Sequence, residues 1–189
     1  MKITSARFIK GVVEADSVLG QKIPQIAFMG RSNVGKSSII NTITNKNGLA
    51  KTSSFPGLTQ EVNIFLINEK VFLIDLPGYG YAKVGKVVRE RIFELINWYL
   101  FDSEYNQKKI VFIIDAFVGP TASDLDILRN LEAHGKDLVV VANKVDKIKS
   151  SLVKKQFQKI ESLIGPHTII PFSVTKRIGI EELLKEVLG

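Results

Sequence analysis

The chain has 189 residues, 45% of them hydrophobic, and its 26 basic and 19 acidic side chains give a formal net charge of +7. This length suits a single domain with its own core, and the absence of cysteine excludes disulfides, thiolate catalysis and cysteine-based metal sites. No apolar run is long enough to span a membrane and no secretory signal opens the chain, so we expect a cytoplasmic protein without membrane contact. We also expect a monomer. The positive charge fits a nucleic-acid partner and ordinary lysine-rich solubility equally well.

Hydrophobic periodicity predicts strands and helices in alternation along most of the chain. Residues 1–22 form an N-terminal extension that either adds an edge strand or packs over the core, and the main domain spans residues 23–189. The predicted strands cover residues 23–29, 62–67, 71–74, 110–114, 138–142 and 168–172. The predicted helices cover residues 38–43, 87–101, 121–134, 152–163 and 180–188.

This order of elements predicts an α/β fold with a mostly parallel sheet of six or more strands and helices on both faces. Only three residues separate strands 62–67 and 71–74, so this pair should be an antiparallel hairpin and one strand should run against the others. In such sheets the ligand binds beyond the carboxyl ends of the strands. Each motif described below follows a strand, except the loop that leads into the hairpin.

The segment between the first predicted strand and helix fits the phosphate-binding pattern G-x-x-x-x-G-K-[ST]. Glycine lets the backbone curl tightly, and the loop N–H groups and the helix N-terminus then face an anion. Lys36 would reach the β- and γ-phosphates and the Ser37 hydroxyl would bind Mg²⁺. The flanking strand and helix argue against a chance glycine turn. The predicted phosphate-loop residues are Gly30, Arg31, Ser32, Asn33, Val34, Gly35, Lys36, Ser37 and Ser38.

Two further segments would complete the phosphate end of the site. Asp75 ends a buried strand, where it would hold Mg²⁺ opposite Ser37, and Gly78 would bring its N–H close to the γ-phosphate. Taken alone, this Pro-Gly segment would suit an ordinary turn better, and the phosphate loop upstream is what favours the functional interpretation.

Upstream, residues 47–60 have the composition of a mobile loop. Gly57, Leu58 and Thr59 come near its end, and Thr59 would complete the Mg²⁺ shell and order the loop with GTP but not with GDP. Thr44 and Thr52 are weaker candidates for that role. Lys36, Thr59 and Gly78 are therefore the candidate catalytic residues, and Ser37, Thr59 and Asp75 the candidate metal ligands.

The fifth predicted strand is followed by Asn143-Lys144-Val145-Asp146, which indicates guanine recognition. A carboxylate at Asp146 accepts two adjacent hydrogen bonds, which guanine offers and adenine does not. Asn143 would tie neighbouring loops together, and the Lys144 stem would lie over the purine. A solvated capping loop is the alternative for this pattern alone. After the last strand, Ser173, Val174 or Thr175 would donate a backbone N–H to the guanine oxygen.

These motifs, in this order, resemble those of the translation-factor class of P-loop GTPases. More narrowly, segments 30–38, 56–60 and 75–82 are similar to those of the bacterial ribosome-biogenesis GTPases known as EngB, YsxC or YihA, with Tyr79-Gly80-Tyr81-Ala82 the most specific part. The resemblance covers residues 23–189 and implies a GTP- and GDP-binding switch with Mg²⁺. It also implies a role in assembly of the large ribosomal subunit and a link to cell division and septation.

Tyr79 stands where Ras-like enzymes carry the water-orienting Gln, so we expect slow intrinsic GTP hydrolysis. Asn33 also raises the hypothesis of a bound K⁺ ion, against the alternative of a plain loop residue. A ribosome contact would use the nucleotide-sensitive loops and the basic residues Lys83, Lys86, Arg89 and Arg91, which equally suit a solvated helix face. The alternatives are a GTP-regulated protein switch without ribosome contact, a non-enzymatic RNA-binding domain and an ATP-using kinase.

Overall fold

The computed structural model describes residues 2–51, 61–80 and 85–189, and this part of the chain forms a seven-stranded sheet with five α-helices. The strands are β1 (Ala6–Val12), β2 (Gln25–Gly30), β3 (Val62–Ile67), β4 (Val71–Asp75), β5 (Gln107–Asp115), β6 (Leu138–Asn143) and β7 (Ile169–Pro171). The α-helices are α1 (Lys36–Thr44), α2 (Lys86–Asn97), α3 (Ala122–Ala133), α4 (Val153–Ile164) and α5 (Ile180–Leu188). Short helical turns are η1 (Trp98–Asp102), η2 (Val145–Lys147) and η3 (Ser150–Leu152).

The strands follow the order β1-β3-β4-β2-β5-β6-β7, and β2 lies at the centre of the sheet. Parallel pairing joins β4, β2, β5, β6 and β7, whereas β3 runs against both of its neighbours. The predicted mostly parallel α/β sheet with one reversed strand is thus confirmed. Residues 6–12, within the N-terminal extension, form the edge strand beside β3, with a bulge between Phe8 and Lys10.

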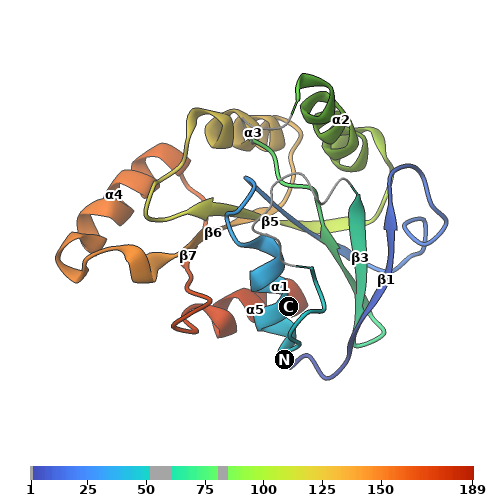
Figure 1. Ribbon diagram of the computed structural model, residues 1–189, viewed down its shortest axis with the longest axis horizontal. Helices are drawn as coiled ribbons and strands as arrows, with labels where there is room; N and C mark the ends of the chain where they lie inside the picture. Colours follow the sequence, from blue (N-terminus) through green and yellow to red (C-terminus); the bar gives the residue numbers. More distant parts are fainter. Residues whose placement is uncertain (1, 52–60, 81–84) are drawn as a thin grey trace.

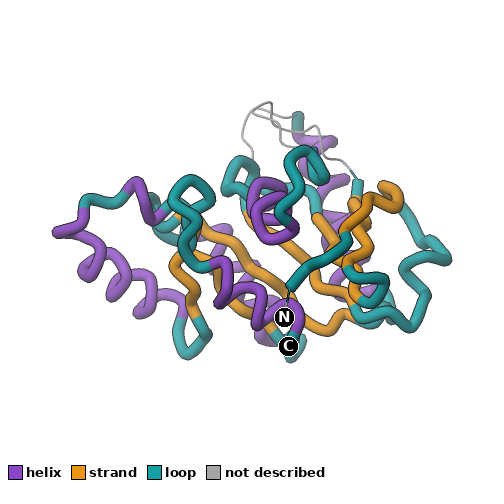
Figure 2. Tube along the Cα trace, turned by 90° about the horizontal axis from the view of Figure 1, so that it is seen from below, coloured by secondary structure: helices purple, strands orange, loops and turns teal. Residues whose placement is uncertain are grey.

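Helices cover both faces of the sheet, as its apolar central strands require. One face packs against α2, α3 and α4 through side chains such as Leu95, Leu128 and Ile160. The other face packs against α1 and α5 through side chains such as Ile40 and Leu183. Figure 1 shows α1 and α5 below the sheet and α2 and α3 above it, and in Figure 2 helices lie in front of the strands.

A local sequence signal marks the start of α3, whereas the end of α2 differs from the prediction. Thr121 caps α3 through a reciprocal capping box with Asp124. The predicted helix over 87–101 divides in the structure, because α2 ends at Asn97 and a π-helical turn continues to Asp102.

Within the described residues, no helix combines the length and the apolar character that crossing a membrane would need.

The reversed strand changes the expectation for the segment that leads into the hairpin. Asn63 in β3 pairs with Asp75 at the carboxyl end of β4. The amino end of β3 therefore lies at the same edge of the sheet as the carboxyl ends of the parallel strands. We had expected this segment to lie away from the edge where the other motifs gather. Its described end, at Glu61 and Val62, lies at that edge instead. Residues 57–59 themselves lie outside the described residues.

Candidate functional site

The loop between β2 and α1 places a buried lysine at the start of a helix. Gly35 precedes α1 with a φ of 105°, and a Cβ there would lie 2.4 Å from Nδ2 of Asn143, so this position requires glycine. Lys36 is the first residue of α1 and is buried, and burial lowers the pKa of its ammonium although the Asp75 carboxylate opposes that shift. A negatively charged ligand beside Lys36 would relieve the cost of burying this charge.

Ser37 and Asp75 meet next to this lysine. The Ser37 hydroxyl donates to Oδ2 of Asp75 over 2.8 Å. The other carboxylate oxygen, Oδ1, is buried without a hydrogen-bond partner among the described residues, and burial raises the pKa of the Asp75 carboxyl. A hydroxyl oxygen beside a carboxylate with an unused oxygen is the donor set that Mg²⁺ takes in P-loop proteins. These residues therefore fit a magnesium ion.

The segment after β4 presses against the phosphate loop. A Cβ on Gly78 would lie 2.8 Å from Cα of Ser32 and 3.1 Å from Nζ of Lys36, so a larger residue would displace the loop. The Ser32 N–H donates to the Tyr79 carbonyl over 2.8 Å. The Asp75–Tyr79 segment and the phosphate loop thus form one surface, as the sequence motifs predict for residues that share a phosphate group.

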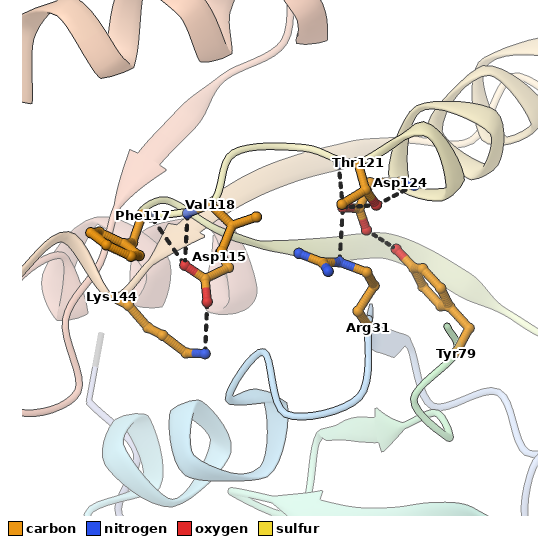
Figure 3. Close-up of polar contacts among 8 residues, drawn as sticks. All are labelled: Arg31, Tyr79, Asp115, Phe117, Val118, Thr121, Asp124 and Lys144. Atoms are coloured by element: carbon orange, nitrogen blue, oxygen red, sulfur yellow. Dashed lines mark hydrogen bonds and ion pairs between the residues drawn. The ribbon is translucent and has the colours of Figure 1, made fainter. Parts of the chain in front are cut away.

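Tyr79 points away from this surface into the core (Figure 3). Its hydroxyl donates to Oδ1 of Asp124 over 2.8 Å, and Oδ2 of the same carboxylate lies 3.0 Å from Nε of Arg31. Burial and the neighbouring Asp124 charge raise the pKa of the Tyr79 phenol, which therefore stays protonated. Asp124 also accepts from the N–H and hydroxyl of Thr121, so one fully buried carboxylate joins α3, the phosphate loop and the segment after β4.

This role of Asp124 is not predicted by the sequence motifs. The available signal was Thr121 three residues before an acidic residue, which predicts a capping box. It did not reveal that the same carboxylate also holds Arg31 and Tyr79. Arg31 was predicted as a phosphate-loop residue, and its backbone lies there, but its side chain is directed at Asp124.

At the other end of the loop, Asn143 and Lys144 bind the phosphate-loop backbone. The Asn143 amide donates to the Val34 carbonyl over 2.8 Å. The Lys144 ammonium donates to the Asn33 carbonyl over 2.9 Å and to Oδ2 of Asp115 over 2.8 Å. Asp115, also missed in the sequence, accepts from the backbone N–H groups that follow it, as Figure 3 shows. Lys144 therefore connects the end of β6, the end of β5 and the phosphate loop.

Asp146 lies in η2, exposed at the same edge of the sheet. The Ser173 hydroxyl donates to its Oδ1 over 2.6 Å, and this hydrogen bond is the main reason why the pKa of Asp146 lies below its usual range. The carboxylate is therefore ionised at neutral pH. The Ser173 N–H donates to the Ile178 carbonyl, which leaves Val174 and Thr175 as the predicted N–H donors to guanine.

The structure thus brings the candidate residues from 30–38, 75–78, 143–146 and 173–175 to one edge of the sheet. Gly57, Leu58 and Thr59, as well as Lys83, lie outside the described residues. Among the residues that are described, no group of three or more acidic, histidine or cysteine side chains gathers to hold a metal on its own.

Comparison with known proteins finds matches along nearly the whole chain. Residues 25–144 match the model of the 50S ribosome-binding GTPase family. A GTP-binding protein EngB from Clostridium perfringens is 41% identical over 187 residues, covering 97% of this chain and 94% of the relative. The EngB protein of Desulforamulus reducens is 44% identical, covering 98% of this chain and 92% of the relative.

Solved structures agree with the sequence matches. The crystal structure of a protein described as EngB superposes with a TM-score of 0.72 at 25% identity, covering 87% of this chain and 96% of that one. The structure of Era in complex with MgGDPNP and nucleotides 1506–1542 of 16S ribosomal RNA superposes with a TM-score of 0.70 at 27% identity. That match covers 89% of this chain and 56% of Era.

Proposed function

Because the chain belongs to the EngB family of GTP-binding proteins, within the 50S ribosome-binding GTPases, we propose that it is a switch that assists assembly of the large ribosomal subunit. The chain is a GTPase, and the proposal concerns what its GTP cycle serves. It would act in the cytoplasm as a monomer, and its loss would disturb cell division and septation. The family description as a 50S ribosome-binding GTPase and the net charge of +7 support a ribosomal partner.

The main support for nucleotide and Mg²⁺ binding is the Oδ1 atom of Asp75, which has no hydrogen-bond partner among the described residues and lies beside Ser37 and the buried Lys36. Mg²⁺ held by Ser37 and Asp75, and by Thr59 in the GTP state, would neutralise charge on the β- and γ-phosphates. Lys36 and the loop N–H groups would hold the same phosphates. The Gly78 N–H would lie close to the γ-phosphate. Catalysis of phosphoryl transfer depends mainly on such positioning and charge neutralisation.

Asp146 would select the base. Its ionised carboxylate would accept the ring N–H and the amino group of guanine, while adenine would leave it unpaired. Lys144 is already fixed to Asn33 and Asp115, so its aliphatic stem can lie along the purine without a large loss of side-chain entropy.

Intrinsic hydrolysis would be slow. The Tyr79 phenol is bound to Asp124 and does not serve to orient water. A partner or an ion would then complete the site. Asn33, which is exposed with a φ of 62°, is the candidate for helping to hold K⁺. Equal hydrolysis rates in potassium and sodium buffers would exclude that role.

Co-sedimentation with large ribosomal subunits tests the proposal. The purified chain should sediment with 50S subunits in a non-hydrolysable GTP analogue, less so in GDP, and should be released as the salt concentration rises. Lys36→Ala should abolish the difference between the nucleotides. Nucleotide-sensitive behaviour without any sedimentation would favour the alternative, a protein-binding switch without ribosome contact. Binding that Lys36→Ala leaves unchanged would indicate a plain RNA-binding domain.

A further inference from the structure

The stretch from residue 147 to residue 160 holds an excess of positive charge. It contains Lys147, Lys149, Lys154, Lys155 and Lys159 and no acidic residue, whereas the whole chain has a net charge of +7. All five side chains are exposed. We call these five residues the lysine surface. This stretch, which runs from the end of η2 into α4, therefore carries a charge of +5.

Asp146 borders this surface and its carboxylate interacts electrostatically with Lys147, but the five lysines lack close ion pairs among the described residues. None of the five forms an ion pair with an acidic residue in the described part of the chain, and the segments left out contain no Asp or Glu. Cations elsewhere do pair: Lys86 with Glu90, Lys109 with Glu186 and Arg129 with Glu132. The lysine surface thus differs from α2, where Glu90 and Glu94 offset Lys86, Arg89 and Arg91.

An exposed aromatic ring adjoins this surface. The Gln156 amide of α4 donates to the Ala116 carbonyl, which precedes Phe117, and Phe117 is 58% exposed. Residues three or four apart share one side of a helix, so Lys159 lies on the same flank of α4 as Gln156, with Lys155 next to it. Lysines beside an exposed aromatic side chain combine phosphate contacts with a platform on which a base can stack.

Helix α4 lies at one end of the molecule and is linked to the nucleotide site. Both views show α4 at one end of the molecule, beyond the β7 edge of the sheet, with α2 well away from it (Figures 1 and 2). The segment that carries Phe117 is fixed through Asp115 to Lys144 (Figure 3). Lys144 in turn contacts the phosphate loop at the Asn33 carbonyl. A partner on α4 would therefore touch a segment that is tied to the nucleotide site.

We propose that the lysine surface, together with Phe117, binds the phosphate backbone and an unstacked base of RNA. This inference rests on the proposed ribosomal function and assigns the RNA contact to α4. It differs from the expectation, drawn from the sequence, that the nucleotide-sensitive loops and Lys83, Lys86, Arg89 and Arg91 supply the contact. RNA is favoured over a membrane surface because the family is described by its ribosome binding.

The test compares two matched double variants in 50S binding. Lys155→Gln with Lys159→Gln should weaken binding about 25- to 60-fold at 0.1 M monovalent salt, because each lost phosphate contact removes about 0.7 to 0.9 from the slope of log K against log salt. Lys86→Gln with Arg89→Gln removes the same charge from α2 and should leave binding and slope unchanged. Both variants should bind GDP like the unmodified chain.

A second comparison tests the aromatic platform. Phe117→Ala should weaken binding about tenfold through lost stacking. Phe8→Ala, at another half-exposed phenylalanine on β1, should not.

The outcomes separate the inference from the proposed function. If the α2 variant loses binding and the α4 variant does not, the assignment to α4 is wrong and the ribosomal function stands. If the unmodified chain binds no 50S subunits in any nucleotide state, both the ribosomal function and the assignment to α4 are wrong. If the α4 variant keeps subunit binding and loses only binding to vesicles rich in anionic lipid, the partner of this surface is a membrane and the inference is overturned.

Discussion

Removing only the hydroxyl of Tyr79 should cost stability and leave GTP hydrolysis unchanged. In Tyr79→Phe the ring still fills its place in the core, while the 2.8 Å hydrogen bond to Asp124 is lost. A hydrogen bond to a charged group contributes about 2 kcal/mol, and Asp124 keeps Arg31 and Thr121 as partners. For a domain of this size such a loss lowers Tm by about 4–8 °C.

Tyr99 offers a matched control at the opposite end of the sheet. It is also fully buried, and its hydroxyl donates to the neutral Oε1 of Gln25 over 2.9 Å. Tyr99→Phe should therefore lose only about 1 kcal/mol, or about 2–4 °C in Tm, and should not change turnover. The truncation Tyr79→Ala is unsuitable, because it would open a cavity that costs about 3–5 kcal/mol by itself.

The assay measures Tm at saturating GDP and Mg²⁺, so that ligand stabilisation is equal across variants, and single-turnover hydrolysis at saturating GTP. The reasoning fails if Tyr79→Phe lowers the hydrolysis rate tenfold or more while its Tm falls no further than that of Tyr99→Phe. That result would mean that the phenol leaves Asp124 and acts on the attacking water.

Three further changes test the rest of the site. Asp146→Asn should turn preference from GTP to XTP, because an amide N–H matches the carbonyl that xanthine carries in place of the guanine amino group; unchanged GTP selectivity in competition binding would contradict the assigned role. Ser173→Ala removes the hydrogen bond that holds the pKa of Asp146 low, so the Asp146 carboxylate should become protonated at a higher pH. On acidification the variant should therefore lose GDP affinity at a higher pH than the unmodified chain, and coincident pH profiles of the two proteins would refute this. Gly35→Ala should destabilise the fold by about 1–3 kcal/mol, since its φ of 105° is strained for alanine and the Cβ would meet the Asn143 amide; an unchanged denaturation midpoint would count against that geometry.

Sequence patterns predicted the elements that depend on local order. The strand, glycine loop and helix around Lys36 are adjacent in the chain, so their motif carries its own structural context. The hairpin of β3 and β4 followed from a three-residue connection in the same way. The alternating buried strands then fixed the fold class and the edge at which the motifs gather.

What could not be predicted depends on contacts between distant segments. Asp124 is 93 residues from Arg31, and only the packing of α3 over the sheet brings the two together. The ion pair of Asp115 with Lys144 likewise arises because β5 and β6 are neighbours in register. The sequence of residues 1–22 did not decide between an edge strand and a segment packed over the core. That choice depends on whether β3 has a free side in the folded sheet. The π-helical turn at Trp98 continues the apolar spacing of α2, so periodicity alone did not show where α2 ends.

The two outer strands also bear on how the molecule behaves at high concentration. At one border, β7 is three residues long and ends in a proline, which has no N–H to offer another chain. At the other, β1 is interrupted by its bulge and carries the exposed side chains of Arg7 and Lys10. Neither border is a long, flat, apolar ribbon of the kind that recruits a second copy through backbone pairing. Both edges therefore have features that disfavour backbone pairing between copies, although the central strands are among the most apolar segments of the chain.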